Sequence, residues 1–254
     1  MGTSGRRRHR WSQSQMILYA NGCSHTAAAE AVVPDAFAVD DGKNGIDRRP
    51  HPLNLAASWC THLAQNLGRT LVCDAESASS NDRIIRTTRE WIANNPDKLN
   101  NTFMVIQWTT WEREEWLHNG TWYQVNASGA DWVPKELQQR YKQFVVDVDW
   151  AIKTQECHEK IWTLHTELQR SNIPHLFYSS YSTFSDVQNQ HIWGTSYMYP
   201  YNRQGSYNAI LQQNGHVPSK WYHFDAKGHC FWANYVLQYI KQHNLVNTNA
   251  LPTD

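Results

Sequence analysis

Ser24 is the first residue whose setting suits chemistry. It follows the short apolar run at 16–20 and stands two residues after Gly22, so it falls where a buried strand must turn sharply. Such a turn exposes the serine hydroxyl and leaves backbone N–H groups free to face an anion. A serine that caps a helix fits the same pattern. The segment therefore indicates a site only in combination with others.

Three further polar segments are candidates to join Ser24. They are residues 77–83 (SASSNDR), 107–114 (QWTTWERE) and 223–229 (HFDAKGH). Each lies next to the expected end of a strand or helix. The first also fits a capped helix start, with Ser80 or Asn81 as the cap and Asp82 favoured by the helix dipole.

The elements that must position these segments alternate between strand and helix. Apolar runs predict strands over 16–20, 70–75, 103–108 and 175–180, and helical spacing predicts helices over 55–67, 82–94, 134–170 (as one helix or two) and 226–243. This alternation predicts an α/β fold, a parallel sheet covered on both faces. Ligands of such sheets bind beyond the carboxyl ends of the strands, where these polar segments fall. Residues 109–134 are expected to form an insertion, and 181–222 a long functional loop.

Composition excludes several classes of protein. The 254 residues carry 23 Lys and Arg against 23 Asp and Glu, which gives no general attraction to nucleic acid or to anionic membranes. No apolar run reaches the roughly 18 residues of a membrane span, and the basic start lacks the apolar region of a secretory signal. Five scattered cysteines indicate reduced thiols. We expect a cytoplasmic protein with a domain over 16–245, a basic tail over 1–15 and a C-terminal tail over 246–254.

In their order and spacing, the four segments resemble the motifs of the SGNH hydrolases, also called the GDSL lipase/esterase superfamily. The first resembles the Gly-Asp-Ser block with Cys23 in place of the aspartate, and the last resembles the Asp-x-x-His block at His223. The similarity spans about residues 16–243. It implies a single-domain, three-layer α/β/α fold with a flavodoxin-like parallel sheet of about four or five strands.

The resemblance also implies roles in ester hydrolysis or acyl transfer. Ser24 is then the nucleophile and His223 the general base, with backbone N–H groups of Ser24 and of the second segment facing the oxyanion. Ala78 replaces the usual glycine there, so the loss is conformational rather than chemical. The family's asparagine in the third block is absent. Thr110 stands near its place, and we favour the side-chain amide of Asn81 as the substitute.

The catalytic acid is the main departure from the family pattern, because Lys220 occupies its position three residues before His223. The centre is then a Ser–His dyad, or another loop supplies a carboxylate, or the site is inactive. Alternatively, His229 is the base and Asp225 its acid. We favour His223.

Arginine, tryptophan and histidine residues indicate the kind of substrate and whether a cofactor is expected. Either Arg83 or Arg113 is a candidate contact for an anionic part of the substrate. Trp111 and the other tryptophans near the insertion (108, 116, 122 and 132) are expected to lie half in the core, and an exposed subset suits stacking on sugars or acyl groups, which favours a small-molecule or carbohydrate ester. The 13 histidines show no metal-ligand spacing, so no metal or cofactor is expected. The alternatives to an ester hydrolase are a catalytically inactive binding or structural protein with the same fold, or an acyltransferase.

Overall fold

The computed structural model describes residues 16–34, 48–126 and 133–246. The expected N-terminal tail over 1–15 lies outside these ranges, and so does all but the first residue of the expected C-terminal tail over 246–254. Segments 35–47 and 127–132, which include Trp132, also lie outside them.

The core is a sheet of five parallel strands. They are β1 (Ile17–Asn21), β2 (Thr70–Cys73), β3 (Thr102–Trp108), β6 (His175–Ser179) and β7 (Tyr197–Met198). Their spatial order is β2-β1-β3-β6-β7, and every neighbouring pair is parallel. This is the flavodoxin-like order, in which chain direction across the sheet reverses between β1 and β3. Strands β1, β3 and β6 are buried along their whole length, as expected of apolar runs inside a parallel sheet.

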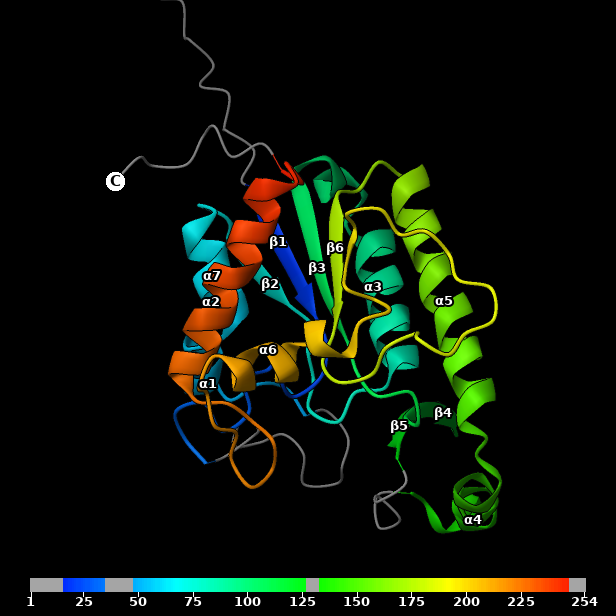
Figure 1. The fold of residues 1–254 in the computed structure, drawn as a ribbon. Coiled ribbons are helices and arrows are strands. Elements are labelled where there is room, and N and C mark those ends of the chain that lie inside the picture. Colours follow the sequence, from blue (N-terminus) through cyan, green and yellow to red (C-terminus); the bar gives the residue numbers. More distant parts are fainter. Residues whose placement is uncertain (1–15, 35–47, 127–132, 247–254) are drawn as a thin grey trace, which may run out of the picture.

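Helices cover both faces of this sheet (Figure 1). One face carries α1 (Pro52–Ala56), α2 (Trp59–Asn66) and α7 (Ala226–Gln242), and the other carries α3 (Asn81–Asn94) and α5 (Trp150–Arg170). Two apolar clusters fill the layers between them. Trp59 and Trp232 belong to the first, and Ile84 and Ile161 to the second. The three-layer α/β/α fold and its parallel sheet are confirmed.

Two predicted helices are each divided by a local cap. The helix expected over 55–67 is interrupted at Ser58, whose hydroxyl accepts the N–H of Thr61 and starts α2. The segment 134–170 forms a short 3₁₀ turn (Lys135–Leu137), α4 (Gln138–Asp147) and α5, where Asp149 accepts the N–H of Ile152. Side-chain oxygens at such caps satisfy N–H groups that a continuous helix would bond internally.

The prediction of a long loop over 181–222 is wrong. This segment contains the two-residue strand β7, a 3₁₀ turn (Arg203–Gly205) and α6 (Tyr207–Gln213). Helix α6 buries Tyr207, Ile210 and Leu211, and Ser206 caps it, but its one short apolar stripe is flanked by polar residues. A strand of two residues leaves no periodic signal at all.

The insertion after β3 is a hairpin of β4 (Glu114–His118) and β5 (Thr121–Val125). Trp116 and Val125 pack with Tyr141 of α4 in a small separate core. A 3₁₀ helix over Pro96–Asn101 precedes β3.

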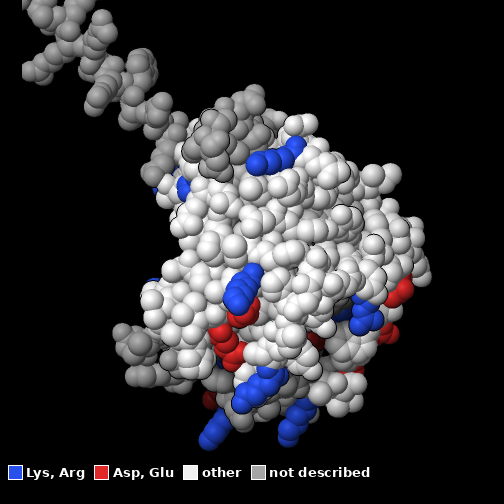
Figure 2. Space-filling model, turned by 60° about the vertical axis from the view of Figure 1, so that its left-hand side comes forward, with Lys and Arg blue, Asp and Glu red and all other residues white. Residues whose placement is uncertain are grey.

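The carboxyl ends of the strands gather at one end of the molecule. In Figure 1 the arrows point toward α6, the β4–β5 hairpin and the loop that leads into α7. Most charged side chains on the face drawn in Figure 2 lie in the half nearest this end. Among the described residues, no helix is both long enough and apolar enough to cross a membrane.

Candidate active site

Ser24 follows β1 directly, in a tight turn. The carbonyl of Cys23 accepts the N–H groups of Thr26 and Ala27, each at 3.0 Å. Gly22 is required by close approach, because a Cβ there would lie 2.3 Å from the Thr26 hydroxyl oxygen. The turn leaves Ser24 at the wall of a cavity, with 9% of its surface exposed. The predicted position of this serine, beyond the end of a buried strand, is confirmed.

This cavity lies at the carboxyl end of the sheet and has a volume of about 720 Å³. It joins predicted residues from three segments that are distant in sequence. They are Ser24 from the first segment, Thr110, Trp111 and Arg113 from the third, and His223 from the fourth. Ser24 follows β1 and Thr110 follows β3, so the cavity opens where chain direction across the sheet reverses, the usual place for ligands in such folds.

Glu30 places a carboxylate beside His223. Its Oε2 lies 3.1 Å from Nδ1 of His223, and both side chains are largely buried. Lys220, which occupies the family's acid position, instead lies over the ring of Trp221. Of the three alternatives for the acid, the structure matches a carboxylate from another loop. Glu30 was missed, although an acidic residue inside the apolar stretch 27–33 (AAAEAVV) is a usable signal, because a buried carboxylate needs a partner.

The Glu30–His223 pair is held by contacts between its two loops. Ser219 donates from its hydroxyl to Oε2 of Glu30 at 2.7 Å and accepts the His223 N–H at 3.3 Å. The carbonyl of Ala31 accepts the N–H of Ala226 at 3.1 Å, which joins the Glu30 loop to the start of α7. Glu30 itself has φ +63°, a left-handed conformation that a glutamate adopts at a cost of about 1–2 kcal/mol.

Both histidines at the cavity favour the neutral state. Burial lowers the pKa of His223 and outweighs the Glu30 carboxylate, which raises it. Burial also holds the pKa of His25 well below its usual value, with His223 and Arg113 adding to the effect. The two imidazole rings are 5.5 Å apart. With Nδ1 of His223 bound to Glu30, its Nε2 is left as the nitrogen that can accept a proton at neutral pH.

The second segment supplies a strained turn. Ala78 has φ +66°, the left-handed region in which glycine is favoured. Among the described residues, the N–H groups of Ala78 and Ser24 have no hydrogen-bond acceptor. The backbone of Ala78 therefore has the conformational cost that was expected of alanine at this position. The N–H groups of Ala78 and Ser24 are available to donate to a ligand.

Asn81 braces the third segment. Its Nδ2 donates to the carbonyls of Thr109 at 3.2 Å and Thr110 at 3.4 Å, and its Oδ1 accepts the Thr109 N–H at 2.9 Å. These bonds occupy the amide that we expected at the oxyanion. Within the described chain, the hydroxyl oxygen of Thr110 is buried at the cavity wall and has no partner. The structure therefore offers Thr110, rather than Asn81, as a free side-chain donor.

Asp225 and His229 are not paired as acid and base. The Asp225 carboxylate caps α7 by accepting the N–H of Gly228 at 2.9 Å. His229 is 1% exposed, and its Nδ1 accepts the N–H of Trp59 at 3.3 Å. Burial lowers the pKa of His229 to about 3. His229 does not line the cavity, whereas His223 does.

The two candidate arginines differ in their surroundings. Arg83 forms an ion pair with Glu76 at 2.7 Å and donates to the carbonyl of Asp74, away from the cavity. Arg113 lines the cavity, and its guanidinium donates to the Ser79 carbonyl at 3.4 Å. Trp111 also lines the cavity but is 4% exposed and stacks on Phe184, with ring centroids 4.8 Å apart. Arg113 is the one of the two arginines that a ligand there can reach.

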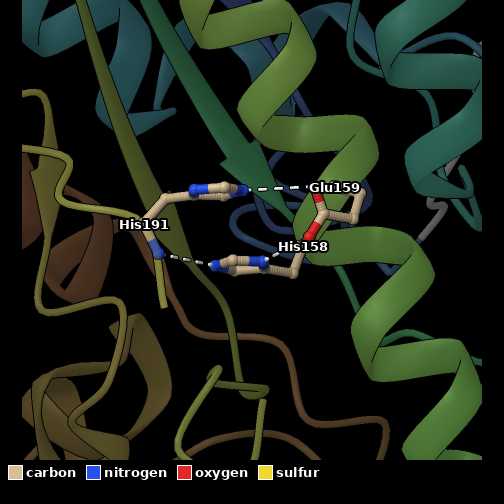
Figure 3. Close-up of side chains that lie close together, drawn as sticks. All are labelled: His158, Glu159 and His191. Carbon is tan, nitrogen blue, oxygen red and sulfur yellow. Dashed lines mark hydrogen bonds and ion pairs between the residues drawn. The ribbon is translucent and has the colours of Figure 1, made fainter. Parts of the chain in front are cut away.

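A separate cluster joins His158 and Glu159 of α5 to His191 (Figure 3), an arrangement that sequence spacing does not reveal. Their ligand atoms lie within 4.8 Å of one another. A metal ion lies in the plane of each imidazole that binds it, about 2.0–2.1 Å from nitrogen for zinc. The two rings are stacked 3° from parallel with centroids 4.7 Å apart, so their nitrogens point side by side and do not converge. The cluster fits a brace, in which Nε2 of His191 meets Glu159 at 3.1 Å, better than a metal centre.

Comparison with solved structures gives distant matches, and two of them show the range of similarity. A lipolytic protein of the G-D-S-L family from Desulfitobacterium hafniense DCB-2 matches at TM-score 0.44 and 12% identity, over 89% of this chain and 99% of that one. The acetyl xylan esterase Est2A from the rumen bacterium Butyrivibrio proteoclasticus matches at TM-score 0.43 and 10% identity, over 89% of this chain and 64% of the esterase. The first is named for the family that the four segments resemble. No family model and no curated protein sequence matches the chain.

Proposed function

We propose that this protein is a serine hydrolase of ester bonds, with Ser24, His223 and Glu30 as its catalytic groups. The observation that carries the proposal is the Glu30–His223 pair, 3.1 Å apart, whose histidine lines the cavity that Ser24 also lines. A carboxylate that holds one imidazole nitrogen fixes the tautomer and leaves the other nitrogen to act as a base. A histidine on the surface without such a partner would not indicate catalysis.

The reaction follows from this arrangement. His223 takes the Ser24 proton as the serine oxygen attacks the ester carbonyl, and Glu30 stabilises the imidazolium that forms. The tetrahedral intermediate collapses to an acyl-serine, and His223 returns its proton to the departing alkoxide. His223 then takes a proton from water as the water oxygen attacks the acyl-serine. When the second tetrahedral intermediate collapses, His223 returns this proton to the Ser24 oxygen and the carboxylic acid is released. The lowered pKa of His223 keeps the base unprotonated at neutral pH.

The oxyanion is stabilised by the N–H groups of Ser24 and Ala78, with the hydroxyl of Thr110 as a third donor after rotation about its χ1. In support, all three donors are without acceptors within the described chain. Removing one such donor typically slows an acyl transfer about 10²–10³-fold.

For the substrate we propose an O-acylated carbohydrate. Two aromatic residues at the cavity, Trp221 and Tyr222, are 61% and 65% exposed. Exposed aromatic rings beside a catalytic serine suit stacking on a sugar. Of the tryptophans near the insertion, 108, 111 and 116 are buried, and Trp122 lies under Arg86. Trp221 and Tyr222 thus replace them as candidate sugar contacts.

Labelling with a fluorophosphonate probe tests the centre. We expect the wild type to be modified at Ser24, located by mass spectrometry, and the folded Ser24→Ala variant to remain unlabelled. Hydrolysis of acetylated sugars is then measured on the same two proteins. Absence of labelling in folded wild-type protein would contradict the proposal and favour a silent binding protein. Labelling with transfer to an added alcohol, in preference to water, would favour the acyltransferase.

A further inference from the structure

Arg113 brings a positive charge into the cavity, and no carboxylate of the described residues forms an ion pair with it. Within the described chain its guanidinium donates one hydrogen bond, to the backbone carbonyl of Ser79 at 3.4 Å, and no Asp or Glu lies within ion-pair distance. The other arginines of this part of the chain are engaged: Arg83 pairs with Glu76 and Arg86 with Glu115. A half-buried guanidinium left without an anion, beside a catalytic serine, suits an anion supplied by a ligand.

Other charged groups also line the cavity, and their positions matter. They are Glu112, Asp186 and Arg203, and Arg203 is exposed at the rim. Among these groups, Arg113 is the one whose charge acts on both His25 and His223, and in each case it lowers the pKa. Arg113 lines the same cavity as Ser24, His25 and His223.

The hydrogen bond to the Ser79 carbonyl also orients the Arg113 side chain. Ser79 follows Ala78 in the strained turn of the second segment, so the guanidinium is held against the loop that offers the oxyanion N–H. Four of the five N–H donors of an arginine remain after one bond. This leaves enough of the planar fork to bind both oxygens of a carboxylate, or two oxygens of a phosphate.

We propose that Arg113 forms a subsite for an anionic group, a carboxylate or phosphate carried by the ester substrate close to the scissile bond. This inference rests on the proposed function and narrows its substrate to acidic sugar esters. A neutral sugar ester would leave the guanidinium without its partner and would bind more weakly.

Three matched esters test the subsite: O-acetylated methyl glucoside, its glucuronic acid counterpart and its phosphorylated counterpart. We expect wild type to turn over one or both anionic esters with a KM about 10–100-fold below that of the neutral ester, the span for hydrogen bonds to charged groups. The variant Arg113→Gln should abolish this preference by raising KM for the anionic ester, with kcat changed much less. Arg113→Lys should restore it partly, because a point charge lacks the fork. Which anionic ester is preferred identifies carboxylate or phosphate.

The control variant is Arg89→Gln, which removes an equal charge from an exposed pair with Glu167 outside the cavity. It should leave the preference unchanged. Equal KM values for all three esters in wild type would overturn the subsite while leaving the hydrolase in place. So would an Arg113→Gln variant that lowers kcat alike for all three, since Arg113 would then serve the transition state. Absence of any turnover, together with absence of fluorophosphonate labelling, would instead overturn the proposed function.

Discussion

Oε2 of Glu30 meets Nδ1 of His223 at 3.1 Å, although the two residues are 193 positions apart in the chain. The contact joins the turn after the first strand to the loop before the last helix. Ser219 bonds to both partners, and the unfavourable φ of +63° at Glu30 is retained. Backbone strain of this kind persists where surrounding contacts enforce it, and it is frequent at active sites.

Replacing Glu30 with glutamine should lower kcat strongly and leave KM nearly unchanged. The amide keeps the size and can still bond to the imidazole, but it favours the wrong tautomer and cannot stabilise the imidazolium. The expected loss is about 10²–10⁴-fold. Steady-state kinetics on an activated acetate ester measure it. The matched control is Glu112→Gln, which removes a carboxylate that lines the same cavity but is not the one paired with His223. Full activity of Glu30→Gln would remove Glu30 from the mechanism.

Thr110→Val should lower kcat about 10²-fold at unchanged KM, the usual result of removing one oxyanion donor. Valine has the shape of threonine without its hydroxyl, and this hydroxyl has no partner whose loss would disturb the fold. Thr110→Ser retains the hydroxyl and should keep most of the activity. Equal activity in the valine variant would leave the oxyanion to the backbone N–H groups alone.

The Asn81→Ala variant tests whether Asn81 stabilises the fold or donates a hydrogen bond to the oxyanion. It removes the hydrogen bonds to the backbone of Thr109 and Thr110, so the free energy of unfolding should fall by about 1–3 kcal/mol. Urea denaturation measures the change, and kinetics are taken on the same protein. A lowered kcat at unchanged stability would instead return Asn81 to the oxyanion.

Ala78→Gly should stabilise the protein by about 1 kcal/mol. Glycine adopts the observed φ of +66° without the contact that a Cβ makes there, and this gain exceeds the entropy that glycine adds to the unfolded chain. Thermal unfolding shows the difference as a raised Tm. Because the N–H of residue 78 is retained, kcat should stay close to the wild-type value. A lowered Tm would contradict the strained-turn assignment.

His229 predicts how stability depends on pH. Its pKa is lowered to about 3 in the folded state, while the unfolded value is near 6.5. Between these values the unfolded chain binds a proton that the folded chain does not, so stability falls as pH decreases from about 6.5 toward 3, by about 1.4 kcal/mol per pH unit. His229→Asn, whose side-chain oxygen can accept the Trp59 N–H, should reduce this slope by that amount. It should also retain turnover. A folded but inactive His229→Asn variant would make His229 the base in place of His223.

Local sequence determined much of this protein. Apolar runs in the sequence predict the buried strands. A cap such as Ser80 starts a helix through a hydrogen bond to the N–H of a residue three positions later. The alternation of these elements dictates a parallel sheet, and a parallel sheet brings the residues that follow its strands to one end. For that reason Ser24 and Thr110, which follow strands, could be expected at one site, and the resemblance to the SGNH hydrolases added His223 from the loop before the last helix. The resemblance to the SGNH hydrolases implied the conformational cost of Ala78, because the family has glycine at that position.

Tertiary structure decided which of these groups have partners. Glu30 contacts His223, the Asn81 amide bonds to the backbone of the third segment, and His229 is buried outside the cavity. These contacts form because loops that are far apart in the sequence pack against one another. Tertiary structure also decided that the rings of His158 and His191 stack in parallel, whereas binding a metal ion would require their nitrogens to point toward one position. Hydrogen bonds and charges act over a few ångströms, whereas the periodic patterns of a sequence report only burial. Periodicity therefore places a residue at the site, and packing alone assigns its role.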